Sequence, residues 1–110
     1  MSGGLPLSET TDDAPITLAL SDIPDGGARI VKADAKRLIA LFRMGERVAA
    51  IENRCPHAGA PLGMGSFDGT TVKCPLHAFA VDVWTGIGNA GKRVRTYPVR
   101  VEAGRVFVGE

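Results

Sequence analysis

Two short stretches decide how this chain is interpreted: residues 55–57 (Cys-Pro-His) and residues 74–77 (Cys-Pro-Leu-His), separated by residues 58–73. The chain contains 2 cysteines and 2 histidines in all, so every one of them belongs to these two stretches. Each stretch places a soft thiolate beside an imidazole on a tight turn, and a proline restricts φ directly after each cysteine. In a folded core all these side chains need partners, and a metal would supply them.

The residue types alone leave three interpretations open. In the first, each loop gives its cysteine to one iron and its histidine to another, so that the two loops clamp a two-iron cluster. In the second, Cys55, His57, Cys74 and His77 bind one tetrahedral zinc ion, although structural zinc sites more often pair Cys with Cys and His with His. In the third, buried cysteines and satisfied histidines bind no metal. A Cys–His nucleophile fits less well, because it usually needs one cysteine and a distant histidine.

Composition narrows the class of protein. A chain of 110 residues suits one domain, and 13 basic against 12 acidic residues give a net charge of +1. That balance leaves no large excess of positive charge with which to bind nucleic acid or an anionic membrane. The apolar runs are too short to span a bilayer, and the polar, acidic start of the chain lacks a signal-peptide layout. We therefore expect a soluble protein of the cytoplasm that binds neither nucleic acid nor membrane.

The pattern along the chain predicts an all-β fold. Residues 37–43 and 47–52 flank Met-Gly-Glu, and residues 97–102 and 105–108 flank Ala-Gly, so each pair is expected to form a hairpin. A further strand is expected over residues 16–20. No helix of ordinary length is convincing, although residues 34–41 could form a short one. The prediction is an antiparallel sandwich.

The domain prediction has two parts: a flexible tail over residues 1–14, and a single domain over residues 15–110. Within that domain, a loop-built insert over about residues 54–91 is rich in glycine and proline. Short strands at residues 70–73 and 80–84 interrupt it.

The flanks of the two stretches carry a resemblance to a known family. Residues 55–62 (CPHAGAPL) and 74–77 (CPLH), followed by Asp82 and Thr85-Gly86, resemble the Rieske ferredoxins, as does the closing hairpin. The resemblance covers roughly residues 16–108. It implies an antiparallel β-sandwich of the Rieske fold, with a small cluster-binding subdomain of two loops. It also implies one [2Fe–2S] cluster per chain, with Cys55 and Cys74 on one iron and His57 and His77 on the other.

This sequence departs from the family pattern near the expected cluster. Ala78 stands where glycine is common, and Val81 where an aromatic residue is frequent, with Phe79 available to fill that space. The covering loop at residues 86–92 (GIGNAGK) contains no proline, which leaves its rigidity open. Phe79 and Val81 also occupy positions where high-potential members carry hydroxyl groups. Fewer hydrogen bonds to the cluster predict a potential near the bottom of the family range, which spans about −150 to +300 mV.

Residues 86–92 also match two phosphate-binding patterns, G-x-G-x-x-G and G-x-x-x-x-G-K. A phosphate loop needs a helix after it and Ser or Thr after the lysine, whereas Arg93 and a strand-like segment follow here. We therefore expect a loop beside the cluster rather than a nucleotide site.

The resemblance implies an electron carrier rather than an enzyme. An oxygenase would need two further histidines for a mononuclear iron, and both histidines of this chain are already used. The expected function is to pass single electrons from a flavin-dependent reductase to a terminal ring-hydroxylating oxygenase, with no small-molecule substrate of its own. The alternatives are the small Rieske subunit of a nitrite reductase and, from a different class, a structural zinc-binding interaction module.

Overall fold

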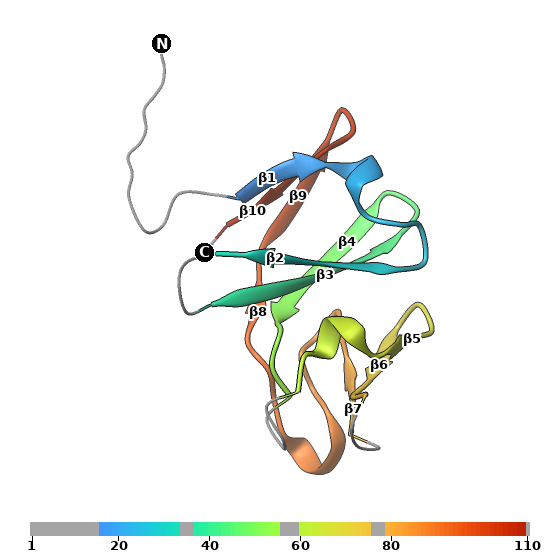
Figure 1. The fold of residues 1–110 in the computed structure, drawn as a ribbon, viewed down its shortest axis with the longest axis vertical. Helices are drawn as coiled ribbons and strands as arrows, with labels where there is room; N and C mark the ends of the chain where they lie inside the picture. The colour runs from blue at the N-terminus through green and yellow to red at the C-terminus, as the bar shows by residue number, and fades with distance from the viewer. Residues whose placement is uncertain (1–15, 34–36, 56–59, 76–78, 110) are drawn as a thin grey trace.

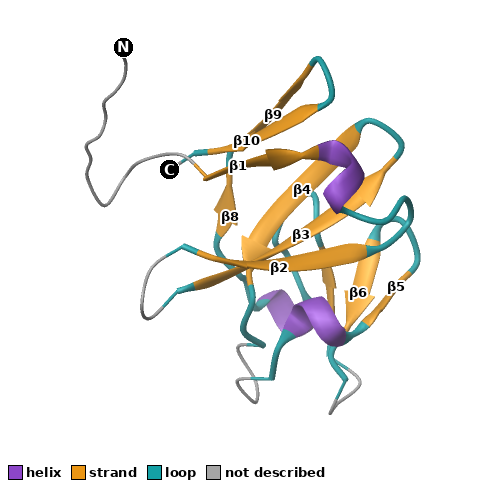
Figure 2. Ribbon diagram, turned by 45° about the horizontal axis from the view of Figure 1, so that its top comes forward, coloured by secondary structure: helices purple, strands orange, loops and turns teal. Residues whose placement is uncertain are grey.

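The computed structural model describes residues 16–33, 37–55, 60–75 and 79–109. Its strands form three antiparallel sheets, in the orders β1-β10-β9, β2-β3-β4-β8 and β5-β6-β7 (Figure 1). The strands are β1 Ile16–Ala19, β2 Ala28–Lys32, β3 Leu38–Met44, β4 Arg47–Glu52, β5 Ser66–Phe67, β6 Thr71–Lys73, β7 Ala80–Asp82, β8 Thr96–Tyr97, β9 Val99–Glu102 and β10 Arg105–Val108. The helical segments in the described residues are single 3-10 turns, η2 Leu20–Asp22, η3 Leu62–Met64 and η4 Asn89–Gly91 (Figure 2).

The β2-β3-β4-β8 sheet is the middle layer, and both of its faces are buried. In β3, Ile39 and Leu41 pack toward the β1-β10-β9 sheet, while Ala40 and Phe42 pack toward the β5-β6-β7 sheet. Strand β4 alternates in the same way. A strand covered on both faces reads as a continuous apolar run rather than as an alternation, which explains why residues 39–42 are all apolar. The hairpin predicted from residues 37–43 and 47–52 is confirmed.

Two apolar clusters fill the spaces on either side of the middle sheet. The upper cluster joins it to β10 and η2, and the lower cluster joins it to η3, β6 and β7 (Figure 1). The upper cluster consists of Leu20, Ile23, Ile39, Leu41, Val48, Ala50, Tyr97, Val106 and Val108. The lower cluster consists of Ala40, Phe42, Ala49, Ile51, Cys55, Ala60, Leu62, Val72, Cys74, Phe79, Val81, Val83 and Val94. Both cysteines therefore belong to the lower cluster.

The expected strand over residues 97–102 is in fact divided at Pro98. Strand β8 pairs with β4 in the middle sheet, whereas β9 pairs with β10 in the outer sheet. Proline has no N–H to donate to a ladder, so the chain changes sheets at that residue. Within β9 the predicted alternation is confirmed, since Arg100 and Glu102 are the exposed positions.

Other expectations need correction. The segment over residues 54–91 is more than loops, because β5, β6 and β7 give it a small sheet of its own. The predicted strand over residues 80–84 ends at Asp82, where a turn begins. Strand β3 occupies residues 38–41, the second half of the range proposed for a short helix. Residues 34–36 lie outside the described residues, as does the predicted tail over residues 1–14. Within the described part of the chain, no helix is long and apolar enough to cross a membrane.

Candidate metal centre

The two cysteines lie at the start of two loops at the same end of the molecule. Cys55 follows β4 closely, and Cys74 directly follows β6. Their relative exposures are 0% and 5%, both belong to the lower apolar cluster, and neither is in a disulfide. Buried thiols in an apolar environment suit the binding of a soft metal.

The same backbone hydrogen bond closes both loops. The Cys55 N–H donates to the carbonyl of Ala60, and the Cys74 N–H donates to the carbonyl of Phe79, each at 2.8 Å. Each loop thus begins at a buried cysteine and ends at a buried residue. His57 and His77 lie inside these two loops and outside the described residues. Among the described residues, no three Cys, His, Asp or Glu side chains form a metal site, as expected when two of the four predicted ligands lie in those gaps.

An asparagine side chain anchors the base of each loop. Asn53 is buried, and its Oδ1 accepts a hydrogen bond of 2.6 Å from the Gly63 N–H, which ties the segment before Cys55 to η3. Asn89 of η4 is exposed, and its Oδ1 accepts one of 2.5 Å from the Ala80 N–H, directly after the second loop. Each carboxamide therefore holds the backbone next to a ligand loop in a defined position.

A close backbone contact at Gly65 brings the two loops together. Gly65 follows η3, and a Cβ at this residue would lie 1.9 Å from the carbonyl oxygen of Lys73, the residue before Cys74. No side chain fits at that distance. The absence of a Cβ therefore allows the segment after the first loop to pack directly on the strand that leads into the second.

The proline-free loop over residues 86–92 is held in place by hydrogen bonds. The Gly88 N–H donates to Lys92 O at 2.7 Å, Val94 N–H to Gly86 O at 2.8 Å, and Asp82 N–H to Ile87 O at 3.0 Å. These bonds surround η4, and Asn89 connects this turn to the second loop. The loop is therefore ordered without proline, and no ordinary helix follows it among the described residues, which argues against the phosphate-binding patterns.

Phe79 fills space beneath this third loop, as the sequence suggested. Its ring lies against Gly88, where a Cβ would be 2.5 Å from Cζ. Asp82 caps the turn that leads into the loop, because its Oδ1 accepts hydrogen bonds from the N–H groups of Trp84 (2.8 Å) and Thr85 (3.2 Å). Phe79 and Asp82 therefore support the loops structurally.

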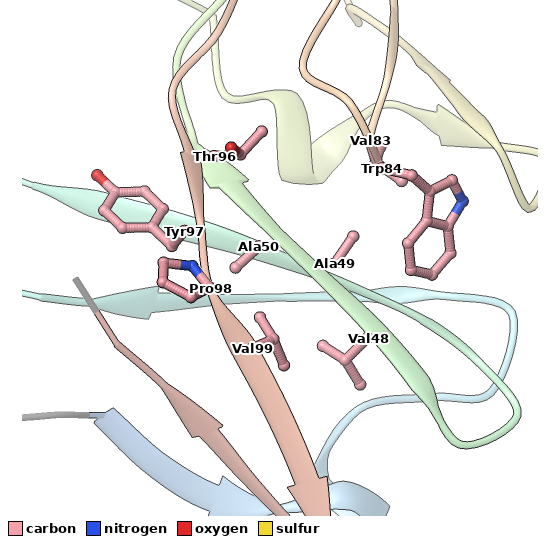
Figure 3. A pocket seen from close by; sticks show the side chains of 9 residues that line it. All are labelled: Val48, Ala49, Ala50, Val83, Trp84, Thr96, Tyr97, Pro98 and Val99. Carbon is pink, nitrogen blue, oxygen red and sulfur yellow. The ribbon is translucent and has the colours of Figure 1, made fainter.

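A surface hollow of about 410 Å³ opens where β8 leaves the middle sheet. Figure 3 shows the Trp84 indole and the Tyr97 ring on either side of it, with Ala49 and Ala50 between them. Its lining is largely aliphatic and aromatic, and its side chains include no carboxylate, amine, imidazole or thiol. This lining provides no acid–base pair or nucleophile for catalysis.

Sequence reasoning identified the two cysteines but missed Asn53, Gly65 and Asn89. A polar residue at the end of an apolar strand was the available signal for Asn53. Asn89 lies in a glycine-rich stretch in which asparagine is ordinary, and Gly65 is one of 14 glycines. Only the folded backbone distinguishes these two residues.

Comparisons with known proteins agree with this geometry. The Rieske [2Fe–2S] domain family matches residues 15–98. The 3-phenylpropionate/cinnamic acid dioxygenase ferredoxin subunit of Escherichia coli is 39% identical over 93 residues, which cover 81% of this chain and 86% of the relative.

Two solved structures have the same fold. A chain of the complex of reduced oxygenase and oxidised ferredoxin in carbazole 1,9a-dioxygenase matches with a TM-score of 0.80 and 30% identity, over 88% of this chain and 94% of the other. A putative NADH-dependent nitrite reductase small subunit from Mycobacterium tuberculosis matches with a TM-score of 0.75 and 27% identity, over 89% and 96%.

The fold and the paired loops define an iron–sulfur electron-transfer protein of the ferredoxin class, not itself a catalyst. The chain belongs to the Rieske [2Fe–2S] domain family, and its cofactor is a [2Fe–2S] cluster. This membership excludes the zinc and metal-free interpretations that the residue types had left open.

Proposed function

We propose that this ferredoxin receives single electrons from a flavin-dependent reductase and delivers them to a terminal ring-hydroxylating oxygenase in the cytoplasm. Its similarity to the ferredoxin subunit of a dioxygenase, over most of both chains, is the observation that carries the proposal.

We further propose that Cys55 and Cys74 hold one iron of the cluster and that His57 and His77 hold the other. The described residues fit such a group, because both thiols are buried in one apolar cluster at the start of two loops with matching hydrogen bonds. When bound, the cluster supplies a reversible one-electron couple. The chain's own contribution is to exclude water from the thiol side and to hold the loops with Asn53, Gly65 and Asn89.

The side chains near the second loop support a low reduction potential. Phe79 and Val81 are buried with 8% and 1% exposure, and neither carries a hydroxyl group. Hydrogen bonds to cluster sulfurs stabilise the more negative reduced state, so side chains without donors leave the potential lower. We expect a midpoint potential close to about −150 mV, the lower limit for such clusters.

The small subunit of a nitrite reductase remains the second candidate, since one such subunit shares this fold at 27% identity. The two candidates differ in the acceptor. A ring-hydroxylating oxygenase takes electrons from the ferredoxin, whereas a nitrite reductase would require the chain as a subunit.

Spectroscopy of the purified protein tests the cluster assignment. We expect two irons and two acid-labile sulfides per chain, and a rhombic EPR signal after dithionite reduction, with the low average g value of histidine-ligated clusters. His57→Cys and His77→Cys variants should raise that average g value if they retain a cluster. One zinc per chain and no EPR signal would contradict the assignment.

Electron transfer to purified partners then tests the function. Reduced ferredoxin should support single turnover by a ring-hydroxylating oxygenase, and a flavin-dependent reductase with NADH should reduce it again. A stable complex with a nitrite reductase, without transfer to any oxygenase, would favour the second candidate.

A further inference from the structure

Exposed basic side chains flank both cysteines and the third loop. Arg54 directly precedes Cys55, and Lys73 directly precedes Cys74. Lys92 and Arg93 follow η4 at the end of the third loop, and all four cations are exposed. We call these four residues, Arg54, Lys73, Lys92 and Arg93, the basic rim.

Two members of the rim lie on neighbouring segments. The hydrogen bond of 2.8 Å from the Glu52 N–H to Arg95 O continues the pairing of β4 with β8 toward the loops. Arg54 lies two residues after Glu52 and Arg93 two residues before Arg95, so both cations lie on the loop side of this hydrogen-bonded pair. Like charges on adjacent segments repel each other in the free protein, so proximity of this kind favours an anionic partner.

Ion pairs within the described part of the chain do not neutralise the rim. No salt bridge in these residues involves any of its four members, whereas Arg100 pairs with Glu102 in β9. The nearest acid in sequence to Arg54 is Glu52, which is half-buried. Lys73 does lower the pKa of Asp68, after the larger effect of the Thr71 and Thr70 N–H groups, so its charge is partly shared.

The exposed acids Asp25, Glu46 and Glu102 lie away from the rim, whereas Asp68 lies near Lys73. Asp25 and Glu46 belong to adjoining turns, where the Asp25 carboxylate accepts a hydrogen bond of 2.8 Å from the Gly45 N–H. Glu102 ends β9, at the upper end in Figure 1, whereas η4 lies at the lower end. Although the net charge of the chain is only +1, residues 53–66, 73–79 and 83–95 together contain five basic residues and no acidic residue.

An exposed apolar side chain accompanies the cations. Ile87 is 46% exposed and forms a bridge with Arg93. Residues opposite each other in an antiparallel bridge point to the same side. An apolar contact bordered by charged groups is the usual composition of a protein interface.

We propose that the basic rim is the docking surface for an acidic patch on the terminal oxygenase. This inference rests on the proposed function and adds to it the sign of charge that the partner must present. Opposite charges orient the two proteins during their encounter so that the cluster-binding end of the ferredoxin faces the oxygenase. Ile87 then contacts an apolar group on the oxygenase.

Small inorganic oxidants test the charge of this end without any protein partner. The anionic oxidant is hexacyanoferrate(III) and the cationic oxidant is hexaamminecobalt(III). In each reaction one electron passes from the reduced ferredoxin to the oxidant, which gives hexacyanoferrate(II) or hexaamminecobalt(II). At low ionic strength, the variant R54E/K92E/R93E should lower the ratio of the rate constants for the anionic and cationic oxidants by about tenfold or more. The matched control R105E, at the start of β10, should leave this ratio nearly unchanged.

Normalising to the cationic oxidant removes changes that affect both reactions alike, such as a shift in the ferredoxin's potential. An unchanged ratio in the triple variant would overturn the proposal. Where the triple variant fails to bind iron, R54E and R93E singly should each give a smaller change in the same direction.

Reaction with a purified oxygenase tests the partner. Binding of the oxidised ferredoxin and electron transfer from the reduced form should both weaken about tenfold or more as salt rises from low to physiological ionic strength. The triple variant should lose most of that dependence, and R105E should keep it. Transfer independent of salt would overturn the docking proposal alone. No transfer to any oxygenase would overturn the proposed function and this choice of partner, while the ratio for the small oxidants still reports the charge of the rim.

Discussion

The segments that carry Cys55 and Cys74 are closed by the same backbone hydrogen bond but are anchored in different ways. The first is held by Asn53, a buried residue of its own segment, which bonds to η3. The second is held by Asn89, an exposed residue of the third loop. The first loop is thus anchored in the core, whereas the second depends on a neighbouring loop. We therefore expect mutations to affect the two loops by different amounts.

The largest effect is expected where the two loops are joined. Gly65→Ala would place a Cβ within 1.9 Å of Lys73 O, so η3 and β6 must separate. We expect destabilisation by about 3 kcal/mol, the upper end for overpacking, and loss of most bound iron. Urea unfolding and iron analysis measure these two quantities. Gly109→Ala is a matched control, because nothing lies within 4 Å of the added Cβ; equal stability of the two variants would show that the close contact is unimportant.

The next effect concerns the anchor of the first loop. Asn53→Ala removes the acceptor for the Gly63 N–H at a site with 7% exposure. A buried donor left without a partner costs about 1–3 kcal/mol. The urea midpoint should fall accordingly, with an unchanged m value. A loss no larger than that of Asn89→Ala would contradict the difference between the two anchors.

A smaller effect is expected from the anchor of the second loop. Asn89→Ala removes an exposed hydrogen bond, worth about 0.5–1.5 kcal/mol. The Ala80 amide should exchange with solvent faster, and its neighbours in the third loop should follow. The Gly63 amide should stay protected, because its acceptor is on Asn53. Faster exchange at both amides would mean that the loops are not separately anchored.

The smallest effect is a pH dependence away from both loops. In the turn between β5 and β6, Thr71 and then Thr70 N–H groups bond to the Asp68 carboxylate and lower its pKa below 3.8. A group with a lowered pKa contributes stability above its unfolded pKa, and that contribution is lost as the pH falls through the folded value. NMR titration of the Asp68 carboxyl should therefore give a midpoint below 3.8. A midpoint at or above 3.8 would contradict these hydrogen bonds.

Much of the fold could be predicted from local patterns. The two hairpins follow from apolar runs on either side of short glycine turns, and the alternation in β9 follows from Val99, Arg100, Val101 and Glu102. The division at Pro98 could not be predicted, because a missing N–H fits an edge strand, a strand start or a change of sheet equally well. Only the long-range partners of β8 and β9 decide among these.

The candidate site could be predicted in part for a similar reason. Cysteine and histidine are rare in this chain, so their spacing carries information even without coordinates. Asn53, Gly65 and Asn89 act through contacts with backbone atoms of distant segments, and such contacts leave no periodic pattern. The third loop shows the same limit, since its order comes from several main-chain hydrogen bonds and not from a proline.

The pairing of Ile16 with Val108 has a consequence for how this fold can be connected. The chain enters the described fold and leaves it at neighbouring points on one outer sheet, so a short linker could join the two positions. New ends could then be opened at the Gly45-Glu46 turn, where the Gly45 position leaves open space. Such a circular permutant should keep every sheet, and the same geometry would allow the domain to be inserted into a loop of another protein without disturbing its host.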